Sequence, residues 1–111
     1  MNTHEHFNRE KLGEQVRHHS PTIKRVLSYA CSHLQHYPHD VHASIRDKDL
    51  AALKAKAAYL RQTALSCALP VLEARARHLE SISYFDRAAI ERMEAAIEQE
   101  IAVVLPLLEE A

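Results

Sequence analysis

Nine of the 111 residues are histidine, and four of them recur at every third position with a cysteine shortly before. Imidazole and thiolate groups are ligands that zinc prefers, so this run is a candidate metal site. On a helix, however, residues three apart differ by about 60° in direction, so the four rings cannot all reach one ion. The run then offers zinc at most a weak pair such as His36 and His39, and otherwise forms a solvated helix edge. We favour the edge and predict no metal site and no cofactor. The residues of the run are Cys31, His33, His36, His39 and His42.

The other groupings that carry chemistry are missing from the sequence. It has no ordered Ser/His/Asp set, phosphate-binding loop, HExxH motif or paired core carboxylates. The acids Glu91, Glu94 and Glu98 are expected on the outer side of the last helix. Cys31 and Cys67 form no CxxC pair and are interpreted as free, partly buried thiols. No buried histidine cluster is visible that would favour a pH sensor. We therefore predict that the protein is not an enzyme.

The composition favours a few long helices joined by short links. Hydrophobic residues make up 47% and charged residues 26%, and there are only one glycine and four prolines. An all-β chain would need more turn residues than that. The formal net charge is −1, so no nucleic-acid partner is expected, although the middle of the chain is basic and its end acidic.

Capping residues and proline mark where the helices begin. Pro38 is expected to bend or restart the second helix, and Pro106 to fray the end of the last one. We predict an all-α, up-and-down four-helix bundle with a short extra N-terminal helix, forming one domain over residues 7–111 after a flexible N-terminal lead at 1–6. The expected starts are Asn8, Ser20-Pro21, Asp47 or Asp49, Pro70 and Asp86.

Each expected helix carries an apolar stripe at helical spacing. These stripes form the predicted core, and Phe7 is expected to pack at the start of the first helix. The stripe residues are Leu12 and Val16; Ile23, Val26, Leu27, Ala30, Leu34, Val41 and Ile45; Leu50, Leu53, Ala57, Leu60 and Ala64; Leu72, Ala76, Leu79 and Ile82; and Ile90, Met93, Ile97, Ile101, Val104 and Leu108.

Nothing in the sequence indicates a membrane or export segment. No leading stretch has the basic-then-apolar pattern of a signal peptide. The longest apolar run, residues 101–108, is too short to cross a bilayer. We expect a cytoplasmic protein with no membrane partner.

The helix expected to begin near residue 50 has a second face beside its core stripe. Side chains within about 60° of Ala58 on this helix form an apolar strip of small residues with a basic edge. Such a strip allows another protein's helix to approach closely. The plainer interpretation is that alanine fills solvent positions because it is the best helix former. The predicted partner-binding residues are Ala51, Lys54, Ala55, Ala58, Arg61, Gln62 and Leu65.

Residues 49–64 of the same helix read DLAALKAKAAYLRQTA. This stretch resembles the signature helix of histidine phosphotransfer (HPt) domains, whose pattern is roughly D-x-x-x-L-x-x-x-A-H-x-L-K-G-S-A. Residues 68–80 read ALPVLEARARHLE and are similar to the family's G-A-x-x-L-x-x-x-A-x-x-L-E. Pro38 and residues 41–49 match its proline-containing second helix. The resemblance covers residues 7–108 and implies an HPt-like bundle in two-component signalling.

Four positions depart from the family pattern. Ala58 stands where the phosphate-accepting histidine is expected, and Arg61 stands in place of the lysine that steadies the phosphoryl group. Gln62 and Ala68 replace two glycines, of which the first lets a receiver domain come close. Alanine has no nucleophilic nitrogen, so no phosphohistidine can form at position 58. His78 is the alternative acceptor that we considered and do not favour.

The resemblance implies a pseudo-phosphotransfer protein in a phosphorelay. It would bind a response-regulator receiver domain or a histidine kinase through the Ala51–Leu65 face without accepting phosphate. Lys54, Lys56 and Arg61 would complement the acidic active site of a receiver. The alternative is a self-associating helical module, such as a homodimer, unrelated to phosphorelay.

Overall fold

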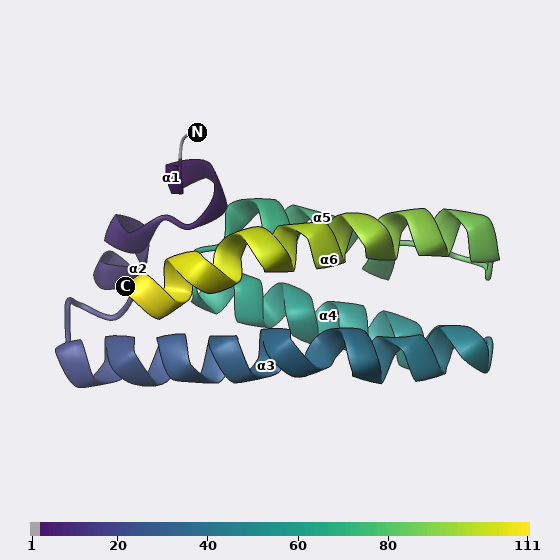
Figure 1. Cartoon of the computed structure of the whole chain (residues 1–111), viewed down its shortest axis with the longest axis horizontal. Helices are drawn as coiled ribbons and strands as arrows, with labels where there is room; N and C mark the ends of the chain where they lie inside the picture. The colour runs from purple at the N-terminus through teal and green to yellow at the C-terminus, as the bar shows by residue number, and fades with distance from the viewer. Residues whose placement is uncertain (1–2) are drawn as a thin grey trace.

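The computed structural model describes residues 3–111, and every regular element in that range is a helix (Figure 1). The described range has no strand, so the prediction of an all-α chain is confirmed. The helices are α1 (Thr3–His6), α2 (Arg9–Gln15), α3 (Ser20–Arg46), α4 (Leu50–Ser66), α5 (Pro70–Glu80) and α6 (Arg87–Glu110).

Side-chain caps start three of these helices where the sequence predicts them. The side chains of Asn8, Asp49 and Asp86 accept hydrogen bonds from the backbone N–H three residues later, at 3.0–3.2 Å. Each bond satisfies one of the free donors of a first turn. Helix α3 begins one residue earlier than expected, because Ser20 is already helical and His19 holds the cap position without a side-chain hydrogen bond to the backbone.

Neither internal proline ends its helix: of the two outcomes expected at Pro38, a bend or a restart, the restart was wrong, and so was the fraying expected at Pro106. Helix α3 runs through Pro38 for 27 residues, and α6 continues past Pro106 to Glu110. A proline removes one backbone donor. Buried side chains flank both positions, with Tyr37 and Val41 around the first. Their packing holds each helix together across the missing hydrogen bond.

Helices α3 to α6 pack as a bundle in which successive helices run in alternating directions (Figure 1). Helix α3 contacts α4 and α6, and α5 contacts the same two helices. The short connections at 47–49, 67–69 and 81–86 leave each helix beside the one before it. Helix α1 packs against α5 and α6.

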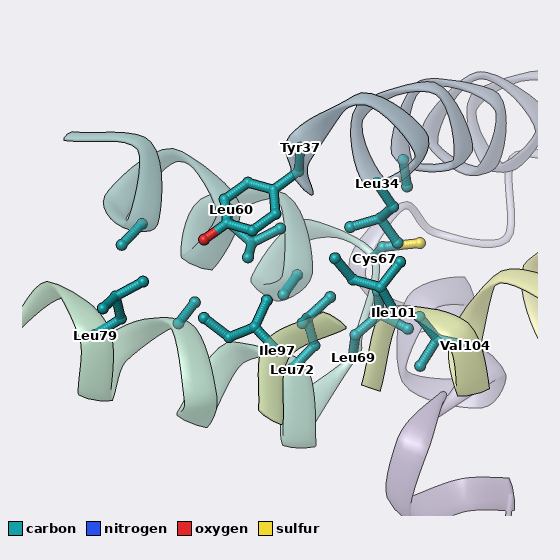
Figure 2. Packing of buried hydrophobic residues seen from close by; sticks show 14 of the residues in the cluster. Leu34, Tyr37, Leu60, Cys67, Leu69, Leu72, Leu79, Ile97, Ile101 and Val104 are labelled. Carbon is teal, nitrogen blue, oxygen red and sulfur yellow. The ribbon is translucent and has the colours of Figure 1, made fainter. Parts of the chain in front are cut away.

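The core lies between these helices and follows the predicted stripes (Figure 2). Leu34, Leu60, Leu72 and Ile97 are fully buried. The ring of Tyr37, which the sequence analysis did not place in the core, enters the same cluster. Six expected core residues lie only half-buried at its edge: Val16, Ile23, Val26, Leu50, Ile82 and Met93.

Three helices are followed by left-handed residues that are not glycine: Arg17 and His18 after α2, Lys48 after α3 and Ala68 after α4. Lys48 and Ala68 have φ of 54° and 57°. After α4, Leu69 N–H donates to the carbonyl of Ala64 at 2.9 Å and Ala68 N–H donates to that of Leu65 at 3.3 Å. This is the Schellman pattern, in which glycine normally holds the left-handed position. The carbonyl of Ala68 also accepts from Asn8 N–H at 2.9 Å, which ties the N-terminal helices to this turn.

Helix α1 lies within the segment 1–6 that was expected to be a flexible lead. Residues 3–6 form this helix, and Met1 and Asn2 lie outside the described residues. His6 Nδ1 lies 2.7 Å from Glu100 Oε2, and Glu100 is 1% exposed. Arg75 Nη1 lies 3.6 Å from the other Glu100 oxygen. This buried carboxylate therefore joins α1 to α5 and α6. Across the described residues, no helix has the length and apolar character needed to cross a membrane.

Candidate functional site

The predicted face of α4 lies on the surface of the bundle. The opposite side of the helix is buried through Leu53, Ala57, Leu60 and Ala64, which turns the alanine strip outward. Leu65 is 52% exposed at the end of the strip, and Ala58 is half-buried in its middle. Of the other predicted residues, Ala51, Ala55 and Gln62 are exposed, and Lys54 and Arg61 are half-buried.

The basic edge of this face is partly neutralised. Arg61 Nε donates to Glu80 Oε2 of α5 at 2.5 Å, and Arg61 Nη2 lies 3.4 Å from Glu80 Oε1. The hydrogen bond raises the pKa of Arg61 and lowers the pKa of Glu80. Lys56 faces α3 instead, where its Nζ donates to the Asp40 carbonyl and to Ser44 Oγ at 2.7 Å each. The sequence analysis expected Lys56 to contact a partner on this face. Its bonds to α3 make it unavailable for that contact.

An aromatic group that the sequence analysis missed lies beside the alanine strip. Tyr59 is 49% exposed, and its ring meets that of His33 edge-on with centroids 4.6 Å apart. His33 Nδ1 is 2.7 Å from Thr63 Oγ1, and burial lowers the pKa of His33. Tyr29 packs one turn before His33 with ring centroids 6.2 Å apart. The spacing of Tyr29 and His33 on α3 was the available signal, but only packing of α3 on α4 brings Tyr59 to them.

Tyr59 separates two grooves between α3 and α4. One, of about 350 Å³, is lined by Arg25, Tyr29 and Gln62 among others. The second, of about 650 Å³, is lined by His39, Ala52 and Ala55 among others. The predicted docking face thus continues into apolar hollows on its α3 side.

The acids of α6 do not all lie outside, which corrects the sequence interpretation. Glu91 is exposed, but Glu94 is 3% exposed. Tyr37 donates its hydroxyl to Glu94 Oε1 at 2.9 Å, and no described group bonds to Glu94 Oε2. Ile90 lies four residues before Glu94 and Ile97 lies three residues after it, and both belong to the core stripe. Helical spacing alone therefore predicts that Glu94 is buried, although its charge suggested an exposed position.

Burial sets the protonation of this carboxyl group. Burial raises the pKa of Glu94 to about 9; Glu98 adds to the rise, and the Tyr37 hydroxyl opposes it. Burial and Glu94 together raise the pKa of Tyr37. Without a further partner, Glu94 therefore holds a proton at neutral pH.

Three of the four histidines of α3 have separate hydrogen-bond partners. His36 bonds to the carbonyl of Ser32 and His33 to Thr63, as His42 Nε2 does to Glu98 Oε2 at 3.0 Å. His39 lines the larger groove. The prediction that the run does not converge on one point agrees with these contacts. One group of three potential ligands is present among the described residues, and it joins His42 to Glu94 and Glu98.

The two cysteines are free, as predicted. Cys67 is buried, and burial raises the pKa of its thiol to about 12. Burial also raises the pKa of Cys31. Because the thiolate is the reactive form, burial makes both thiols less reactive than a free cysteine.

No protein-family model matches this chain, and no match was found among curated proteins or among solved structures.

Proposed function

We propose that the protein is an HPt-like docking module that binds a receiver domain or a histidine kinase through α4 and does not accept phosphate. The observation that carries this proposal is the outward-facing strip Ala51–Leu65, in which half-buried Ala58 holds the position that the sequence pattern reserves for the acceptor histidine. The alternating bundle of α3 to α6 supports the proposal, because an HPt-like helix would present this face in such a packing.

The contact would be apolar more than electrostatic. Arg61 is held by Glu80 and Lys56 by α3, so Lys54 is the main cation left on the edge of the strip. Leu65 and Tyr59 supply large exposed apolar area beside the alanines. Apolar burial is insensitive to salt, whereas exposed ion pairs are screened. Binding should therefore weaken only slightly as salt rises.

Docking at this face leaves the partner's phosphoryl group in place. A phosphorylated aspartate on a receiver would meet the methyl group of Ala58, which cannot attack phosphorus. The module would then occupy the surface that a true phosphotransfer domain uses. It would act as a regulatory or decoy adaptor.

The test is to titrate receiver domains and histidine kinases from the same organism against the tag-free protein by calorimetry. Ala55→Glu places a charge in the strip and should weaken binding at least tenfold. Ala102→Glu is the matched control, since Ala102 is an exposed alanine on α6, and it should bind like the wild type. Absence of any binding, or equal binding by Ala55→Glu, would refute the proposal.

Phosphate acceptance is tested separately with a phosphorylated receiver. When this protein is added, the receiver should lose its phosphate label no faster than by its own hydrolysis. An acid-labile label on this protein would contradict the proposal and would direct attention to another histidine, such as the exposed His78.

Self-association through the same strip is the second candidate function. Small residues let two helices approach closely, and the strip is long enough to span about four turns of α4. Sedimentation distinguishes the two. A dimer that Ala55→Glu dissociates, with no receiver or kinase bound, would favour self-association.

A further inference from the structure

Three side chains with metal-binding atoms meet between α3 and α6. His42 extends from α3, and Glu94 and Glu98 lie one turn apart on α6. One ligand atom from each lies within 4.8 Å of those of the other two. We propose that His42, Glu94 and Glu98 form a binding site for a divalent transition-metal cation, with Zn²⁺ as the best fit.

The buried oxygen of Glu94 is the independent sign of a ligand. Glu94 is 3% exposed, and its Oε1 accepts from the Tyr37 hydroxyl at 2.9 Å. When Glu94 is ionised, its Oε2 has no donor among the described groups, because the nearby Glu98 is another carboxylate. A buried polar atom without a partner is costly, and native proteins nearly always satisfy it. A cation held with Glu98 and His42 would supply the missing interaction.

The ligand set determines the class of metal. One imidazole nitrogen and two carboxylate oxygens suit Zn²⁺, whereas Mg²⁺ prefers oxygen ligands and water alone. Ligand atoms around a tetrahedral Zn²⁺ lie about 3.4 Å apart. The His42 and Glu98 atoms are already 3.0 Å apart, and both side chains are exposed enough to turn toward Glu94. Glu94 itself is fixed by Tyr37, as metal ligands commonly are by a second hydrogen bond.

The neighbouring charges leave the site accessible to a cation. The three residues line a surface groove of about 410 Å³, together with Arg46, Arg87 and Glu91 among others. Arg87 is turned toward the carbonyl of Ile45 and the carboxylate of Glu91, both at 3.5 Å. Arg46 is paired with Asp47 on its own side of the groove. Three protein ligands would leave a fourth position open to solvent, where a water or an added ligand can bind.

The experiment is a titration of tag-free, chelator-treated full-length protein with Zn²⁺ by calorimetry, and with Co²⁺ by visible absorption. We expect one equivalent of Zn²⁺ to bind and to raise the melting temperature, and Co²⁺ to give the intense absorption of low-coordinate cobalt. Mg²⁺ should do neither. Glu98→Gln and His42→Ala should each weaken Zn²⁺ binding at least tenfold, and Tyr37→Phe about tenfold or more, through loss of the bond that orients Glu94.

Matched controls separate this site from adventitious binding to other histidines. His36→Ala and His39→Ala remove exposed imidazoles from the same helix and should leave the affinity and the cobalt spectrum unchanged. Circular dichroism establishes that each variant is folded. If His42→Ala and Glu98→Gln bind Zn²⁺ as the wild type does, or if the His36 and His39 variants lose it, the proposed site is wrong. Failure to bind any Zn²⁺ overturns it equally.

Discussion

Replacing Glu94 by glutamine in metal-free buffer should make the stability of the protein less dependent on pH. Burial raises the pKa of Glu94 from its ordinary 4.5 to about 9 in the folded protein. Between those values the folded state holds a proton that the unfolded state has lost. The free energy of unfolding therefore falls as pH rises through this window, and the contribution is fully present only below the unfolded pKa.

The size of the effect follows from the width of the window. Each pH unit in it changes the free energy of unfolding by about 1.4 kcal/mol, which gives about 4 kcal/mol between about pH 5 and about pH 8. Glu94 lines a surface groove, so contact with water will reduce this pH-dependent change in the free energy of unfolding. We expect a loss of at least about 1.5 kcal/mol in the wild type over that range, relative to Glu94→Gln.

Urea denaturation followed by circular dichroism, in chelator and at several pH values, measures this difference. Glutamine keeps an oxygen that can accept from Tyr37 and carries no charge, so it imitates the protonated acid. Glu91→Gln, an exposed acid on the same helix, should follow the wild type. Parallel pH profiles for the wild type and Glu94→Gln would refute the argument that Glu94 is protonated by burial.

Three further substitutions test the fold. Ala68→Gly should stabilise the protein by about 0.5–1 kcal/mol, because glycine adopts the left-handed conformation without strain. The same change at helical Ala102 should destabilise the protein by about 1 kcal/mol. Equal effects of the two changes on urea denaturation would contradict this. Asp49→Ala should cost about 1 kcal/mol through loss of the α4 cap, and Asp49→Asn should restore most of it. Leu60→Ala should cost about 2–5 kcal/mol as a core cavity, and a loss below 1 kcal/mol would show that the core closes around it.

Local chemistry made the helix starts and the core stripes predictable. Asp49 and Asp86 cap their helices with bonds that span three residues, so the sequence around them contains the whole cause. The continuation of α3 through Pro38 was not predictable from local sequence in this way. Its cost is local, but the burial of Tyr37 and Val41 that outweighs it depends on helices far along the chain.

The same division explains what was predicted of the candidate sites. The exposure of the α4 strip follows from the helical period, because Leu53 and Leu60 mark the buried side. The pairing of Arg61 with Glu80 requires α4 to lie against α5, which no single-helix pattern contains. Glu94 was missed because its charge suggested solvent, although its spacing placed it in the core.

The buried carboxyl group of Glu94 should make the boundary between α3 and α6 less stable than the boundary between α4 and α5. The buried side chains of α5 are all apolar, namely Leu72, Ala76 and Leu79, and α5 packs closely on α4. Across from them, Tyr37 and Glu94 put a polar pair into the boundary of α3 with α6. Transient opening of the native protein should therefore start by parting α3 from α6, with the α4–α5 hairpin as the last unit to come apart.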